Sequence, residues 1–139
     1  MAGRPKMKWQ DMVSERPLSD QEIVTGLSCT FRLNTSEIMV SRKLDNFVNP
    51  CDAKLVCIAS QRNDGFRCIL SIYAYFDASG LDEMTVVTGF ARACNTELLI
   101  SDDSPNPYTM IRVLPIGDVV SVKLDVDRLD DKDEYHIRE

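Results

Sequence analysis

The feature that most constrains the fold is a β-hairpin pattern over residues 53–76. An Asp-Gly pair separates two runs rich in β-branched and aromatic residues, "AKLVCIAS" and "FRCILSIYAYF", and this pair favours a tight hairpin turn. In the second run, the even-numbered side chains from Phe66 to Phe76 share one face of the strand. The opposite face holds an isoleucine and two tyrosines, so we predict that another part of the protein covers it.

A helix is predicted at about residues 80–94, after the hairpin. Its apolar residues recur at helical spacing from Met84 to Cys94, and Asn95 favours a C-terminal stop. Two threonines and Gly89 lower the intrinsic helix propensity, so this helix needs tertiary packing to form. The apolar runs that follow predict strands at residues 97–101, 108–115 and 119–127.

The segment before the hairpin predicts a short helix and a further pair of strands. Ser19 and Glu22 have the spacing of a capping box, and we expect Gly26 to end the helix. A strand that begins at Ile23 is the alternative. Residues 27–44 alternate on both sides of an Asn-Thr-Ser turn, which predicts a second hairpin.

The order of these elements predicts an α+β domain. Strands, one long helix and more strands with short connections indicate a largely antiparallel sheet, with the helix at about 80–94 on one face. We divide the chain into a basic, partly flexible N-terminal arm at residues 1–18 and a single domain at residues 19–139 that ends in an acidic tail. A chain of 139 residues suits one such domain.

The net charge of −6 argues for a basic partner and against nucleic acid. Phosphates repel an acidic protein, whereas a basic protein attracts it. The five cysteines have no CxxC spacing, which predicts reduced core thiols in the cytoplasm. No segment has the roughly 18 uninterrupted apolar residues of a membrane span, and the N-terminus does not resemble a secretory signal.

The sequence contains no recognisable catalytic constellation. His136, the only histidine, lies in a charged tail near the C-terminus, where it is a poor base for a serine or cysteine nucleophile. The adjacent carboxylates of Asp102 and Asp103 suit Mg²⁺ or Ca²⁺, but such sites need further oxygen ligands, and loops use the same residue types to fix their backbone. We therefore predict no catalytic residues, no enzyme activity, no cofactor and no metal site.

Acidic residues in the last third of the chain form the predicted binding surface. Such a surface steers a basic partner toward it, and exposed tyrosines supply the aromatic anchors that interfaces favour. The predicted partner-binding residues are Asp102, Asp103, Tyr108, Asp125, Asp127, Asp130, Asp131, Asp133, Glu134 and Tyr135.

The same region carries a pattern of a helix end, a short strand, an acidic loop, an apolar strand, a Pro-x-Gly turn and a closing acidic strand. Its residues are Phe90, Ala91, Asn95, 98–100, Asp102, Asp103, 106–108, Pro115 and Gly117. This pattern resembles the C-terminal part of small bacterial immunity proteins that accompany polymorphic or contact-dependent inhibition toxins. The resemblance implies a non-enzymatic, cytosolic binder that neutralises a cognate toxin, commonly a basic nuclease.

Two functions of other classes stay open at this stage. A viral or phage accessory protein would contact nucleic acid through the basic arm, where an Arg-Pro segment can lie in a minor groove. A carboxylate-dependent enzyme would bind a divalent ion. The sequence also leaves the oligomeric state open, since the strand at residues 119–127 would form a dimer seam if it lies at a sheet edge.

Overall fold

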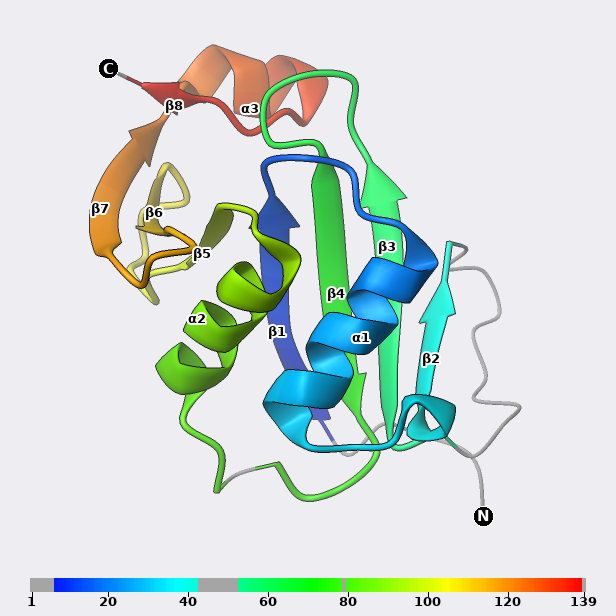
Figure 1. Ribbon diagram of the computed structural model, residues 1–139. Coiled ribbons are helices and arrows are strands. Elements are labelled where there is room, and N and C mark those ends of the chain that lie inside the picture. The colour runs from blue at the N-terminus through cyan, green and yellow to red at the C-terminus, as the bar shows by residue number, and fades with distance from the viewer. Residues whose placement is uncertain (1–6, 43–52, 79, 139) are drawn as a thin grey trace.

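The computed structural model describes residues 7–42, 53–78 and 80–138. These residues form one eight-stranded sheet in the order β2-β3-β4-β1-β5-β6-β7-β8 (Figure 1). All neighbouring strands are antiparallel except β2 and β3, which are parallel. The strands are β1 Met7–Ser14, β2 Ile38–Ser41, β3 Leu55–Gln61, β4 Cys68–Ala74, β5 Leu98–Ser101, β6 Thr109–Val113, β7 Val119–Leu124 and β8 Ile137–Arg138.

Two twelve-residue helices, α1 Asp20–Phe31 and α2 Glu83–Cys94, lie side by side over one face of the sheet (Figure 1). A 3₁₀ turn, η1 Thr35–Glu37, precedes β2, and a short helix, α3 Val126–Lys132, follows β7. The predicted α+β class with a largely antiparallel sheet is confirmed. The predicted single main helix was too simple, because α1 covers as much of the sheet as α2.

The hairpin predicted from the Asp-Gly turn is confirmed and consists of β3 and β4. Leu55 lies opposite Ala74 and Gln61 opposite Cys68, so the whole of both strands is paired. On β4 the even-numbered side chains are fully buried beneath the helices, and the odd-numbered ones are half-buried on the other face. The turn contains Gly65 with a positive φ of 73°, a conformation that glycine adopts without steric cost.

The prediction of an N-terminal arm is wrong from residue 7 onward. Residues 7–14 form β1, which lies between β4 and β5 in the middle of the sheet. Met12 and Ser14 are completely buried there. The strand escaped recognition because charged residues flank its short apolar part and its partners lie more than fifty residues away. Residues 1–6 lie outside the described residues.

The prediction that the first helix ends at Gly26 is also wrong. The capping box of Ser19 and Glu22 is present, but α1 continues to Phe31 and stops at Arg32 in a left-handed conformation. Residues 27–31 therefore belong to a helix, and the predicted hairpin at 27–44 does not exist, although its second half contains β2. The alternating apolar residues also fit helical spacing, since the side chains of Ile23, Leu27 and Phe31 are all buried against the sheet.

Gly26 has a packing role where a stop was expected. A Cβ atom at this position would lie 2.8 Å from the sulfur of Cys94 and 2.8 Å from a ring carbon of Phe90, both on α2. Glycine therefore allows the two helices to approach closely. The predicted end of α2 is confirmed, because Asn95 adopts a left-handed C-cap, while Asp82 caps the first turn by accepting a hydrogen bond from the Thr85 N–H.

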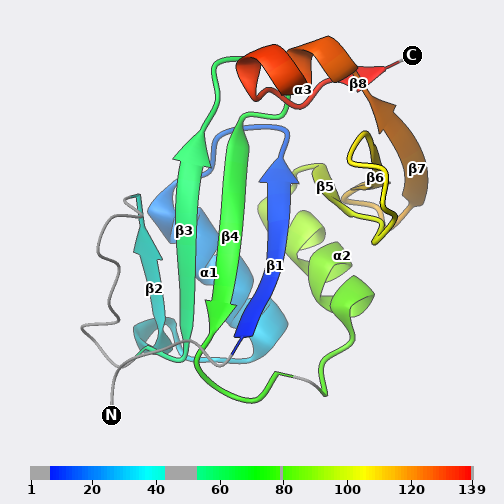
Figure 2. The same cartoon turned by 180° about the vertical axis from the view of Figure 1, so that it is seen from behind.

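The C-terminal residues, with α3 and β8, lie across the end of the sheet that carries the β3–β4 turn (Figure 2). A second apolar cluster lies there, formed by buried Val13, Phe66, Leu99 and Leu124 with Tyr135 and Ile137 packed against it. The backbone N–H of Phe66 donates to the carbonyl of Tyr135 at 2.9 Å, so the chain end returns to the start of β4. The segment shares this cluster with Ile69 of the hairpin, whereas Tyr73 and Tyr75 pack with Ala53, Val56 and Ile58, so the predicted cover reaches only one end of that face. No helix in the described parts of the chain is long and apolar enough to cross a membrane.

Candidate functional site

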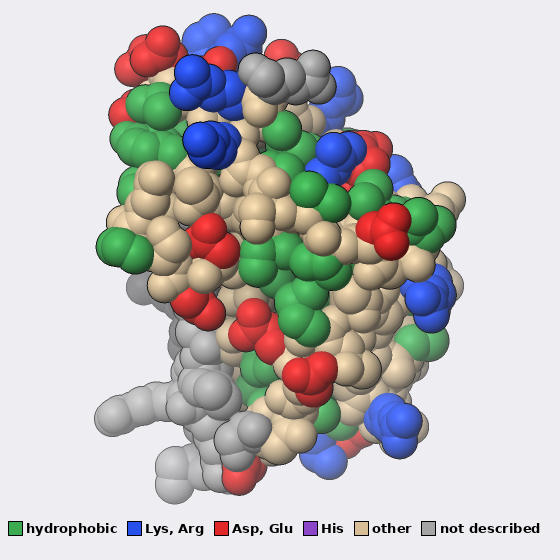
Figure 3. Space-filling model, turned by 90° about the vertical axis from the view of Figure 1, so that its left-hand side faces the viewer, with side chains coloured by type: hydrophobic (Ala, Val, Ile, Leu, Met, Phe, Trp, Pro, Cys, Tyr) green, Lys and Arg blue, Asp and Glu red, His purple; other side chains and the backbone are tan. Residues whose placement is uncertain are grey.

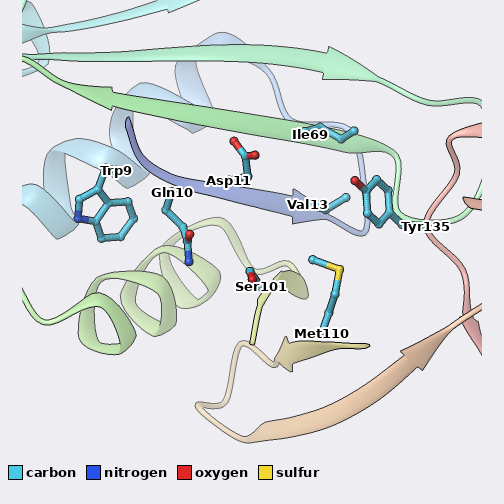
Figure 4. A pocket seen from close by; sticks show the side chains of 8 residues that line it. All are labelled: Trp9, Gln10, Asp11, Val13, Ile69, Ser101, Met110 and Tyr135. Carbon is cyan, nitrogen blue, oxygen red and sulfur yellow. The ribbon is translucent and has the colours of Figure 1, made fainter. Parts of the chain in front are cut away.

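An open cleft of about 340 Å³ lies where β1 and β5 separate. These strands pair only through Val13 with Leu99 and Ser14 with Leu98, so the sheet is open beyond this point. The wall of the cleft is mixed, with apolar side chains from several strands and one carboxylate on β1. Its lining residues are Trp9, Gln10, Asp11, Val13, Ile69, Ser101, Met110 and Tyr135 (Figure 4).

A smaller hollow of about 230 Å³ continues from the cleft toward α3. Ser101, Met110 and Tyr135 line both hollows. The remaining wall of the smaller one comes from the β5–β6 loop and from Leu129 of α3. The acidic loop that the sequence singled out therefore forms the rim of a continuous concave surface.

The β5–β6 loop is shaped by its own side chains. The backbone N–H groups of Asp103 and Ser104 donate to the side chains of Ser101 and Asp102, each at 3.0 Å. The same two-residue step recurs where the N–H of Tyr108 donates to Asn106 at 2.9 Å. These are the local side-chain turns that Asp, Asn and Ser favour. The loop is thus a connection between two strands whose backbone is fixed by local hydrogen bonds, which was the simplest interpretation of its sequence.

The two adjacent carboxylates of this loop have different roles. The Thr109 hydroxyl and the Ser104 backbone N–H both hydrogen-bond Asp102 and lower the pKa of its carboxyl group. Asp103 is exposed and adopts a left-handed φ of 60°. Asp102 therefore stabilises the loop, and Asp103 presents its charge to solvent.

Asp103 lies near a second carboxylate, on the first turn of α2. Partial burial and the negative charge of Asp103 raise the pKa of Glu83. Gln10, which lines the cleft, donates a hydrogen bond to Glu83 at 2.9 Å. Asp11 therefore lies in the wall of the cleft, whereas Glu83 lies beside it, bonded to Gln10, and Asp103 lies near Glu83. Sequence reasoning missed the first two, because β1 had not been recognised as a strand.

The predicted residues of the C-terminal segment lie mostly in structural contacts. Asp125 caps α3 by accepting the N–H of Arg128, and Asp133 forms an ion pair with Arg62 at 2.6 Å. Glu134 is buried beside Arg128, with only 7% of its surface exposed. The prediction that this carboxylate lies on a partner-binding surface is therefore wrong, since a partner cannot reach it without local opening.

The two predicted tyrosine anchors also differ from each other. Tyr135 is half-buried in the second apolar cluster, and burial raises the pKa of its phenol; it contributes a wall of the cleft and is no exposed anchor. The hydroxyl of Tyr108 donates to Asp130 on α3, at 3.0 Å and 2.9 Å from the two carboxylate oxygens. This contact joins the loop to α3. Asp127 and Asp131 lie exposed on the same helix.

Positive charge interrupts the acidic surface around α3 and β8. Arg128, Lys132 and Arg138 are exposed among the carboxylates. On the side of the molecule that carries β7, both signs are interleaved at the upper end, whereas carboxylates border a hydrophobic patch in the middle (Figure 3). The segment is therefore not the uniform acidic tail that its composition suggested.

The cysteines agree in part with the prediction of core thiols. Cys57, Cys68 and Cys94 are buried, and burial raises the pKa of the thiol groups of all three, that of Cys94 to about 11. Cys29 is exposed on α1, contrary to the prediction. Cys51 lies outside the described residues. Comparison of the chain with protein-family models, curated proteins and solved structures gives no significant match.

Proposed function

We propose that the protein is a non-enzymatic binding module of the bacterial cytoplasm, an immunity protein that neutralises a cognate basic toxin. The observation that carries this proposal is the concave surface, whose apolar wall includes Asp11 and has the carboxylates of Glu83 and Asp103 beside it. The resemblance of the C-terminal third to immunity proteins supports the same function.

This combination of walls and charge fits lysine or arginine side chains. Both have an apolar stem that packs along hydrophobic surface and a cation that carboxylates attract. Val13, Ile69 and Met110 supply the apolar contacts inside the cleft, and Asp103 supplies exposed charge at the loop. A toxin domain that binds nucleic acid is rich in such side chains.

The net charge of the chain adds a long-range contribution. At −6 it attracts a basic partner before contact and raises the association rate at low ionic strength. We assign this steering role to the exposed carboxylates Asp103, Asp127 and Asp131. Asp102, Asp125, Asp133 and Glu134 act within the fold instead, and Tyr108 acts together with Asp130.

The test starts with capture of the partner from lysate of the native host on the tagged protein, at low and at high salt. Each captured protein is then expressed alone and together with this chain. The proposal expects one basic protein that arrests growth alone, is harmless when co-expressed, and is lost from the tagged protein at high salt. Recovery of nucleic acid, or of proteins whose activity this chain leaves unchanged, would count against the proposal.

Matched variants locate the surface. Asp103→Asn and Asp118→Asn each remove one exposed negative charge, but Asp118 lies in the β6–β7 turn, away from the cleft. The first change is expected to slow association several-fold, and the second to leave it nearly unchanged. Equal effects of the two would assign steering to net charge alone.

A further inference from the structure

We propose that Asp64, Glu134 and His136 form a binding site for a divalent transition-metal ion of the Zn²⁺ class. One ligand atom from each residue lies within 4.8 Å of the other two. The Nε2 atom of His136 is 3.5 Å from a carboxylate oxygen of Glu134 and 3.9 Å from one of Asp64. This site is separate from the cleft and does not rest on the proposed function.

The burial of the His136 Nε2 atom without a hydrogen-bond partner is the observation that points to a ligand. This atom is buried, yet it has no hydrogen-bond partner among the described residues. Buried polar atoms are nearly always hydrogen-bonded, so an unpartnered one needs an explanation. An imidazole nitrogen is a good ligand for zinc, and here it faces two carboxylates, one of them on a side chain that is only 9% exposed.

The hairpin turn is built to bring the third ligand close. A Cβ atom on Gly65 would lie 2.4 Å from the carbonyl oxygen of Tyr135 and 3.0 Å from His136 Nε2, so only glycine allows this approach. The Gly65 N–H donates to one carboxylate oxygen of Asp64 at 2.9 Å. That bond orients the carboxylate and leaves its other oxygen toward His136, as hydrogen bonds around metal ligands commonly do.

The donor set indicates the type of ion. One imidazole and two carboxylates suit Zn²⁺ and related transition metals, whereas Mg²⁺ and Ca²⁺ prefer oxygen ligands alone. Donor atoms about 2.0–2.2 Å from a tetrahedral ion are roughly 3.3–3.6 Å apart. The two distances from Nε2 are therefore close to those that a bound ion requires.

Arg128 is the group that a metal ion would replace. Its guanidinium lies 3.4 Å from Glu134 and 3.8 Å from Asp64, where it balances part of their negative charge. The Arg128 side chain is 43% exposed, so it can turn into solvent when a divalent ion takes over this role. A bound ion would then connect the β3–β4 turn to the C-terminal segment.

The experiment is thermal unfolding of the full-length protein after chelator treatment, with Zn²⁺ or Mg²⁺ added back. A ligand that binds only the folded state raises the unfolding midpoint, by roughly 5–10 °C at about 100 times its Kd for a chain of this size. We expect this rise with Zn²⁺ and none with Mg²⁺. Direct calorimetric titration of the folded protein should give one ion per chain.

Three variants decide the assignment. His136→Gln and Asp64→Asn should each abolish the Zn²⁺-induced rise. The Asp64 side chain is 56% exposed, so Asp64→Asn should fold like wild type. Cys29→Ser removes an exposed thiol that can also bind zinc and should keep the rise. The proposal is overturned if wild type shows no rise, or if the rise survives in Asp64→Asn.

Discussion

Two acidic segments, the β5–β6 loop at residues 102–107 and the C-terminal segment at residues 125–134, serve different purposes in this fold. In the loop, polar side chains mainly bond backbone groups two residues away, as Asp102 does with Ser104. In the C-terminal segment, two carboxylates bond residues far along the chain, Asp133 with Arg62 and Asp130 with Tyr108. The first pattern shapes a strand connection, and the second fixes the C-terminal segment to the β3–β4 hairpin.

The comparison shows that the availability of a carboxylate depends on long-range pairing that local sequence does not reveal. Asp103 and Glu134 are both charged residues next to an apolar strand in the sequence, but one is exposed and the other is buried beside Arg128. Removing the exposed charge of Asp103 should therefore change binding, and removing the buried charge of Glu134 should change stability.

The largest expected effect is a loss of stability when the apolar contact that holds the C-terminal end of the chain is removed. Phe66→Ala should lower the free energy of unfolding by about 3 kcal/mol, because Phe66 is buried in the second apolar cluster with Tyr135 packed against it. Urea denaturation measures this loss. Tyr108→Phe, which removes only the exposed hydrogen bond to Asp130, should cost under about 1 kcal/mol. Similar losses in both variants would show that polar contacts close the segment as strongly as the apolar cluster does.

The second largest expected effect is a loss of stability when the buried carboxylate of Glu134 is neutralised. Glu134→Gln should lower the free energy of unfolding by about 1–2 kcal/mol, because it leaves Arg128 and His136 beside a neutral amide. Asp131→Asn is the matched control, since it removes an exposed charge from the same segment and should stay within about 0.5 kcal/mol of wild type. Both are measured with a chelator present, so that no bound ion contributes. Equal stability of the two variants would contradict a stabilising role for the buried group.

A smaller effect is expected on the loop side of the comparison. Asp103→Asn should leave the free energy of unfolding within about 0.5 kcal/mol of wild type, because the side chain is exposed. Its association with the basic partner should slow several-fold at low salt and converge with wild type at high salt, where charges are screened. Stopped-flow mixing at several salt concentrations measures both trends. A salt-independent difference would assign Asp103 a direct contact and no steering role.

The sequence was sufficient for elements that carry their own signals. The Asp-Gly turn, the alternation of β4 and the stop at Asn95 all act within a few residues, and the structure confirms them. It was insufficient for β1, whose pairing with β4 crosses more than fifty residues, and for α1, where Leu27 and Phe31 fit both strand and helix spacing. The cleft depends on both of these elements, so its residues on β1 could not be predicted.

The smallest expected effect is a change in the pH dependence of stability at Asp102. Hydrogen bonds from Thr109 and Ser104 lower the pKa of this carboxyl group in the folded state below its usual range. Its contribution to stability is therefore fully present above the unfolded pKa and is lost as the pH falls through the folded pKa. Wild type should lose stability as the pH drops from about 5 to about 2.

Asp102→Asn keeps the acceptor for the Ser104 N–H but has no charge to titrate. Its stability curve should be less steep than that of wild type below about pH 4 and parallel to it near neutral pH. Urea denaturation at several pH values gives both curves, with Asp103→Asn as the neighbour that should retain the wild-type slope. If the two variants lose the same slope, the low-pH effect belongs to the net charge of the loop, and the local hydrogen bonds that distinguish Asp102 from Asp103 contribute nothing to it.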